Sequence, residues 1–350
     1  MTDIILKSKP WVAKLPKGIK QVLEKRKTET KFSRSAHHPF WVIVNKEIAD
    51  HVRSWRFLIL IGIIVITCIG AMLNAAMNFS DAVKTGGADS SFFFLKLFTA
   101  TDGSLPSFVF FISFLGPLLG ISLGFDAVNS EENKGTLSRV MSQPIHRDYL
   151  INAKFTAALI VISVMLFALG FLVIGIGLIA IGIPPTAEEF LRIVFFLIFS
   201  IFYVAFWLNL SIYFSIRFKH AATSALSGIA VWLFFSVFYN LIVNLIAKLT
   251  APSETASMQK VFNYQQFIFH LTHILPSQLF DDATTTLLVP GVRSLGPLTQ
   301  QQVIGAIPSP LPLTQSLLLV WPQVTGLIAI TVVCFALSYV SFMRREIRSR

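Results

Sequence analysis

A compact charged stretch, residues 126–154, interrupts a chain that is otherwise mostly apolar. It carries Glu131 and Glu132 near its start and Arg147 and Lys154 near its end. Acidic and basic groups at this density can make charge-assisted contacts with each other or with a partner. A loop that only connects two elements could be far shorter. The chemistry that this stretch offers is therefore recognition of a polar surface, and the alternative is a loop with a purely topological role.

Two residues that break regular structure divide this stretch, Gly135 and Pro144. The pattern predicts a short helix over 131–140 that is interrupted near Gly135 and stopped by Pro144. Residues 147–154 then lead into the next apolar run. Gly135 permits either a tight backbone approach or a turn.

The sequence contains none of three common catalytic patterns. It has no G-x-x-x-x-G-K-[ST] phosphate loop, no H-E-x-x-H zinc pair and no G-x-S-x-G nucleophile elbow. His270 and His273 form H-x-x-H and would share one face of a helix. Zinc requires three or four protein ligands, so we expect two interfacial histidines. They stay as candidate metal ligands only, and no metal site is predicted.

The elements that position these residues are long apolar runs. The 350 residues are 54% hydrophobic and 13% charged, whereas soluble domains carry roughly 25% charged residues. Runs of about 18 or more apolar residues indicate membrane-spanning helices. The two cysteines, Cys68 and Cys334, lie inside such runs and suggest neither a disulfide framework nor a zinc site. The sequence predicts an all-α polytopic membrane protein with six spans, at 57–77, 107–125, 155–181, 190–216, 222–247 and 317–342.

The distribution of basic residues predicts the orientation. If both termini are cytoplasmic, the inside segments carry 23 of the 29 Lys and Arg residues. These segments are 1–56, 127–154, 217–221 and 343–350. The positive-inside rule is then satisfied throughout, and the net charge of +11 reflects cytoplasmic loops rather than nucleic-acid binding. No Asp, Glu, Lys or Arg lies near the middle of a predicted span, which argues against ion coupling as the energy source.

The region before the first span divides into two parts. Residues 1–36 form a basic cytoplasmic arm, expected either to be disordered on anionic lipid or to form a short helix over 18–27 that contacts a partner. Residues 37–56 are predicted to form an amphipathic elbow helix in the cytoplasmic interface. Its apolar face consists of Trp41, Val44, Ile48, Val52 and Trp55, and its opposite face of Asn45, Lys46, Glu47, Asp50 and Arg53.

The loop at 248–316, between spans five and six, is predicted to lie outside and is too apolar to be a solvated linker. Its first half is rich in aromatic residues and its second half in proline. We expect one or two short helices against the outer ends of the spans, followed by an irregular segment that is buried in protein or lines a cavity.

The charged stretch resembles the cytoplasmic loop of ABC-2-type transporter permeases. The matching pattern is D-x-x-x-x-E-x-x-x-G-T-L-x-x-x-x-S-x-P-I-x-R-x-x-x-x-x-x-K. It covers Asp126, Glu131, Gly135, Thr136, Leu137, Ser142, Pro144, Ile145, Arg147 and Lys154. The elbow, the six spans and the segment HILPSQLFDDATTTLLVP at 273–290 extend the resemblance over residues 57–350 and the elbow before them. The long basic arm and the Pro-rich stretch depart from the simplest family pattern.

The resemblance implies that 126–154 docks on a separate ABC ATP-binding subunit, which holds ATP and Mg²⁺. The chain itself would then bind no cofactor and would not be an enzyme. Two ATPases would sit under two permeases, either a homodimer or a pair with a similar permease, in a prokaryotic plasma (inner) membrane. Transport would be export. The residues assigned to coupling are Glu131, Glu132, Gly135, Thr136, Leu137, Pro144, Arg147 and Lys154. The charged members Glu131, Glu132 and Arg147 either contact the ATPase or brace the loop against the elbow or the ends of the spans, and the sequence leaves both roles open.

Two other classes of function are compatible with the sequence. The first is a non-transporting membrane anchor or assembly factor that recruits a cytoplasmic partner through the same loop. The second, a membrane-embedded enzyme, ranks last because no catalytic constellation is visible. Membrane lipid is an expected partner in each case, nucleic acid is not, and the substrate stays open.

Overall fold

The structure is a computed structural model that describes residues 38–77, 92–99, 106–143, 145–182, 184–253, 256–292 and 310–345. The basic arm at 1–36, Pro144 and most of the Pro-rich half of the outside loop lie outside these residues. The described residues form helices and no strands, which confirms the predicted all-α class.

Six stretches of the described chain are long and apolar enough to cross a membrane, as predicted. Four are the single helices α4 (Trp55–Met77), α10 (Arg147–Ile181), α11 (Ala187–Arg217) and α17 (Leu313–Met343). The second span is α7 (Phe108–Gly124), which a turn joins to α8 (Asn129–Asn133). The fifth span runs through α12 (Ala221–Leu233), the π-helical segment η2 (Phe234–Phe238) and α13 (Tyr239–Thr250). Because α10 begins at Arg147, residues 147–154 are its first two turns.

The helix α11 is the centre of the bundle. It packs against α7 and α17 along most of its length and also contacts α10 and α15 (Pro276–Leu288). Large side chains such as Trp207 and Tyr203 are almost fully buried on it. Its N-terminus has a capping box in which Thr186 and Glu189 bond each other's backbone N–H groups, so this central helix begins at a defined residue.

Three glycines of α7, Gly116, Gly120 and Gly124, are spaced four residues apart and face α11. A Cβ atom on Gly120 would lie 2.7 Å from the carbonyl oxygen of Val204, and one on Gly124 would lie 2.8 Å from that of Leu208. Small residues at this spacing let two membrane helices approach closely. The Ser211 hydroxyl uses this closeness to donate to the carbonyl of Ile121 at 3.1 Å.

At the other end of α11, the buried Arg192 ties the outside loop to the bundle. Its guanidinium donates to the carbonyl of Leu287 at 2.8 Å, to that of Leu311 at 2.6 Å and to the Glu188 carboxylate at 2.8 Å. These bonds fix the end of α15 and the start of α17. The short helices expected in the loop are α14 (Met258–Thr272) and α15. Of these, α15 packs into the bundle, where Ser113 of α7 donates to Asp281 at 2.7 Å.

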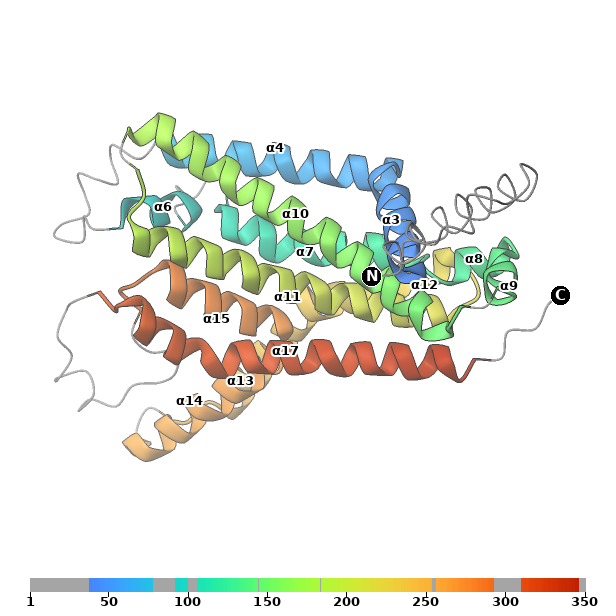
Figure 1. The fold of residues 1–350 in the computed structure, drawn as a ribbon. Coiled ribbons are helices and arrows are strands. Elements are labelled where there is room, and N and C mark those ends of the chain that lie inside the picture. The colour runs from blue at the N-terminus through green and yellow to red at the C-terminus, as the bar shows by residue number, and fades with distance from the viewer. Residues whose placement is uncertain are drawn as a thin grey trace, which may run out of the picture.

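The remaining helices gather at the two ends of the bundle (Figure 1). The helices α3 (Pro39–Val52), α8 and α9 (Thr136–Met141) lie at the end where α17 finishes, and α3 runs across the bundle there. The short helix α6 (Phe93–Thr99) lies at the opposite end. The elbow region and the charged loop, far apart in sequence, are therefore neighbours.

The close approach of α7 and α11 predicts that alanine destabilises the protein at Gly120 but not at Gly175. Gly120→Ala places a methyl group against the backbone of α11, and we expect it to lower the free energy of unfolding by about 1–3 kcal/mol. Gly175→Ala, on α10, meets nothing within 4 Å and should cost nothing. Unfolding in mixed micelles measures both; equal effects of the two substitutions would contradict the close packing.

Candidate functional site

The site is built on the elbow helix α3, which packs across the first turns of α10. Pro39 occupies the start of α3, where a missing N–H costs nothing. Val44 of α3 and Ala153 and Ala157 of α10 form a small buried cluster at the crossing. The small size of the two alanines lets the helices lie close together, so polar groups beside this cluster are removed from water.

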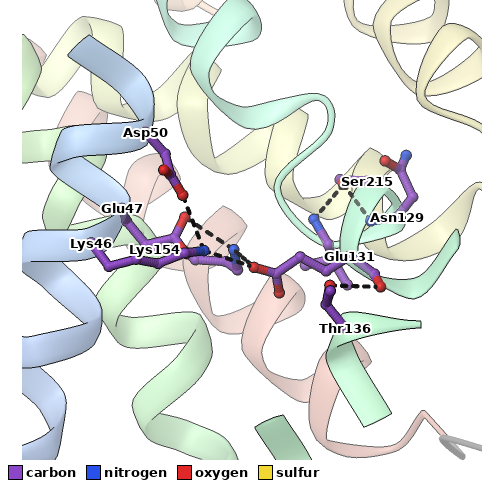
Figure 2. Close-up of polar contacts among 9 residues, drawn as sticks. Lys46, Glu47, Asp50, Asn129, Glu131, Thr136, Lys154 and Ser215 are labelled. Atoms are coloured by element: carbon purple, nitrogen blue, oxygen red, sulfur yellow. Dashed lines mark hydrogen bonds and ion pairs between the residues drawn. The ribbon is translucent and has the colours of Figure 1, made fainter. Parts of the chain in front are cut away.

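Lys154 is the centre of the site and one of its most buried charges. Its side chain is only 4% exposed, and its Nζ lies 3.1 Å from Oε2 of Glu47 on α3 and 2.9 Å from Oε1 of Glu131 on α8. Figure 2 shows Lys154 reaching from α10 towards both carboxylates. A single buried ammonium therefore joins the elbow, the charged loop and the third span.

Lys46 adds a second, more exposed cation. Its Nζ lies 2.8 Å from Glu47, 3.1 Å from Asp50 and 3.4 Å from Glu131. The second carboxylate oxygen of Glu131 is buried and accepts no hydrogen bond from the described residues. Two lysines thus share three carboxylates, and Glu131 depends on the lysines for the stabilisation of its charge. We call these residues, Lys46, Glu47, Asp50, Glu131 and Lys154, the elbow network.

The network favours the ionised forms of Glu47 and Lys46. Burial acts to raise the pKa of Glu47, but Lys154 and Lys46 outweigh it and hold the pKa below its ordinary value of 4.5. Burial acts to lower the pKa of Lys46, but Glu47, Asp50 and Glu131 raise it above 10.5. The Glu47 contribution to stability is thus present above about pH 4.5 and lost as the pH falls through the lowered pKa. The Lys46 contribution is present below about pH 10.5 and lost as the pH rises through the raised one.

The rest of the charged loop is also bonded to membrane helices. The backbone N–H groups of Val128 and Asn129 donate to the Ser215 hydroxyl of α11 at 2.9 and 3.2 Å (Figure 2). Outside the close-up, Asp126 pairs with Arg56 of α4 at 2.6 Å, and Glu132 pairs with Arg345, just after α17, at 2.6 Å. Residues 126–133 are therefore fixed to the ends of several spans at once.

Gly135 makes the turn between α8 and α9. Its φ of 68° lies in the left-handed region, and no atom lies within 4 Å of a Cβ placed on it. Of the two roles that the sequence left open, the structure shows the turn and not the tight approach. Thr136 closes this turn by donating to the carbonyl of Glu131 at 3.1 Å (Figure 2), and Leu137 packs into the core at 2% exposure.

The loop also carries three exposed basic residues, Lys134, Arg139 and Arg147. None of them forms an ion pair with a described residue. We call these residues the basic tip. Of them, sequence reasoning selected only Arg147, together with Glu131 and Glu132, and it left open whether each contacts a partner or braces the loop. The two glutamates form ion pairs with Lys46, Lys154 and Arg345. No local sequence pattern predicts these pairs, because the partners are distant in the chain.

The elbow differs from its predicted form at two points. Val44 is fully buried and Ile48 partly buried, but Trp41 and Val52 are about half exposed. Trp55 is 78% exposed and is the first residue of α4, so it does not belong to the elbow helix. Glu47, expected on the polar face, is instead buried against α10, because that face of α3 covers Lys154 rather than water.

The predicted histidine pair does not form a metal site in the described chain, where no group of three potential ligands comes together. His273 is engaged elsewhere: its Nε2 lies 2.5 Å from Oδ2 of Asp282, and its ring contacts that of Phe269 at a tilt of 37°. His270 is exposed. The pair His273–Asp282 links the end of α14 to α15.

Comparisons with known proteins agree with this architecture. The family described as ABC-2 family transporter protein matches residues 41–347. A protein of Pseudomonas aeruginosa named "Probable ABC transporter permease protein NosY" is 25% identical over 56% of the chain. A protein of the same name from Stutzerimonas stutzeri is 24% identical, also over 56% of the chain. Each match spans 66% of the relative's length, slightly less than two thirds.

The elbow network predicts that its two lysines are far from equivalent. Lys154→Ala leaves Glu47 and Glu131 buried with one partly exposed cation between them, and we expect a loss of about 3–5 kcal/mol of stability. Lys46→Ala removes a half-exposed charge and should cost about 1 kcal/mol or less. The measurement is the temperature at which each variant loses its monodisperse form in detergent, and it should fall much further for Lys154→Ala.

Lowering the pH distinguishes whether Lys154 stabilises the protein through its charge or through its packing. Lys154→Ala removes the ammonium that lowers the pKa of Glu47, so burial raises the pKa of that carboxyl and favours its protonation. The gap between this variant and the wild type should therefore narrow between pH 7.5 and about pH 5. A gap that is independent of pH would mean that Lys154 acts through packing alone.

Proposed function

The chain belongs to the ABC-2 family of transporter proteins, and we propose that it is the membrane-spanning permease subunit of an ATP-driven exporter. In this proposal the loop at 126–154 receives the movement of a separate ATP-binding subunit and passes it to the spans. The ATPase holds ATP and Mg²⁺, and this chain carries no catalytic group. The location is the plasma (inner) membrane of a prokaryote, with both termini in the cytoplasm.

The observation that carries the proposal is the way the loop is fixed. Coupling requires that a push on the loop moves the spans, and packed elements with charged anchors transmit such a push as a unit. The loop is anchored to α3 and α10 through Lys154, to α11 through Ser215 and to the end of α17 through Arg345. A loop that serves only as a connection has no need of these buried bonds.

The residues of the loop, of which Lys134 and Arg139 are not among those predicted for coupling, therefore divide into two groups. Leu137 and Lys154 are buried and Glu131 is largely buried and paired with Lys154, so these three would hold the loop in place rather than reach a partner. The basic tip is exposed and unpaired within the described chain and would meet the ATPase. An acidic groove on that subunit is the complementary surface. Glu132 acts with the first group, because it is paired with Arg345.

Two permeases are proposed to pair over two ATPases, as a homodimer or with a similar chain. The fifth span supports such pairing because it is the span least covered by the rest of the described chain. Its exposed apolar side chains include Leu226, Leu241 and Leu245. Lipid could cover the same residues, so the pairing rests on the family and not on this face alone.

Reversal of charge on the basic tip tests the proposal. The full-length chain is purified from its host, and the ATP-binding protein that co-purifies is identified by mass spectrometry. The double variant Lys134→Glu/Arg139→Glu should weaken its binding at least about tenfold, because like charges would then face each other. The matched control is Lys260→Glu, at an exposed position on α14 in the outside loop. This variant should bind the ATPase like the wild type.

A second variant distinguishes residues that hold the loop on the spans from residues that bind the ATPase. Glu131→Gln should leave the ATPase bound but reduce substrate-stimulated hydrolysis, because the loop is then held less firmly to α3 and α10. Wild-type binding and hydrolysis in both sets of variants would contradict the coupling role. Retained binding with no substrate-dependent hydrolysis in any form would favour the non-transporting anchor.

A further inference from the structure

An apolar groove runs along the outside of the bundle between α3, α4 and α10. It has a volume of about 350 Å³, within the range of small-molecule sites. Its lining contains no polar side chain and consists of Ile48, Val52, Phe57, Ile61, Val65, Ile160, Val161, Val164, Met165, Ala168, Leu169 and Leu172. Val164 is 65% exposed, so the groove is open on one side.

The groove is long and narrow, and it starts at the elbow. On α10 its lining extends from Ile160 to Leu172, which is about 18 Å at 1.5 Å per residue. Half of a bilayer's hydrocarbon core is about 15 Å thick. Both α4 and α10 are membrane-spanning helices. The groove thus covers the depth of one leaflet, on the side of the membrane where α3 lies.

At the elbow end of the groove, the chain continues with one cation, Arg53, that has no ion-pair partner among the described residues. Arg53 follows Val52, which lines the groove, and it is exposed. The other ordinarily charged residues of α3 and the start of α4 are engaged: Lys46, Glu47 and Asp50 in the elbow network, and Arg56 with Asp126 at 2.6 Å. Arg53 forms no ion pair with a described residue. The neighbouring Trp55 is 78% exposed, as is usual for aromatic residues at the level of lipid headgroups.

We propose that this groove binds one acyl chain of an anionic phospholipid from the leaflet on the side of α3, with the lipid phosphate on Arg53. An apolar trough without polar groups fits a hydrocarbon chain, and a guanidinium fits a phosphate. A second copy of this chain would have to supply both a protruding apolar ridge and an acidic group at the mouth. A phospholipid accounts for both observations, because its acyl chain fits the apolar groove and its phosphate fits the unpaired cation at one end.

The bound lipid would affect the elbow directly. Ile48 and Val52 line the groove from the same helix that carries Lys46, Glu47 and Asp50. An acyl chain in the groove buries these two side chains against α4 and α10, and so favours the position of α3 that pairs Glu47 with Lys154. Anionic lipid would therefore stabilise the elbow network, independently of the direction of transport and of the ATPase.

The test is photocrosslinking with phosphatidylglycerol that carries a diazirine on one acyl chain. The full-length chain is reconstituted in nanodiscs, and crosslinked peptides are mapped by mass spectrometry. Crosslinks are expected on residues 57–65 and 160–172. Ala168→Trp fills the open side of the groove and should lower this yield at least about fivefold. The control Ala336→Trp, at an exposed alanine of α17 away from the groove, should leave it unchanged.

The headgroup is tested separately by Arg53→Glu. The wild type should prefer phosphatidylglycerol to phosphatidylcholine carrying the same acyl probe, and the variant should lose this preference. Equal yields for Ala168→Trp and Ala336→Trp would overturn the groove site. The absence of a headgroup preference in the wild type would overturn the role of Arg53. Crosslinking of the groove to a second copy of the chain would replace the lipid with a dimer contact.

Discussion

The burial of Lys154 is the constraint on which the arrangement at the elbow end depends. An ammonium taken out of water costs several kcal/mol unless carboxylates compensate it. The compensating groups, Glu47 and Glu131, come from the elbow and the charged loop. Their positions cannot vary independently, because displacement of either one leaves a buried charge without its partner. The elbow, the loop and the third span must therefore keep a fixed geometry or move together.

The rest of the bundle gives this unit a rigid support. The glycines of α7 bring it into backbone contact with α11, and the second span continues directly into the loop. At the far end, Arg192 fixes α15 and α17 to the same central helix. Movement applied at the loop would thus act on helices that are already bonded to each other at both ends. This is the property that a transporter driven from outside its own chain requires.

Much of the fold could be predicted from the sequence because it follows from local patterns. Six apolar runs predict six spans, and the 3.6-residue spacing of Val44 and Ile48 predicts a helix before them. The bonding of the loop could not be predicted, because it depends on residues such as Lys46, Lys154 and Arg345 that are distant in sequence. Charge alone therefore left open whether Glu131 contacts a partner or braces the loop, whereas the structure pairs it with Lys154 and Lys46. Likewise, the sequence predicted short helices in the outside loop that pack against the spans, but not that α15 would bring Asp281 within hydrogen-bond distance of Ser113 of the second span.

A distance measurement tests most directly whether the elbow and the loop form one unit. Spin labels at Val42 on α3 and Ser142 just after α9, both exposed, report their separation in the chain bound to the proposed ATPase, with and without trapped nucleotide. Labelled chains diluted with unlabelled ones give the distance within one copy. We predict one narrow distance that is the same in both states and that broadens in Lys154→Ala. A distance that changes with nucleotide, or one that Lys154→Ala leaves narrow, would contradict the account.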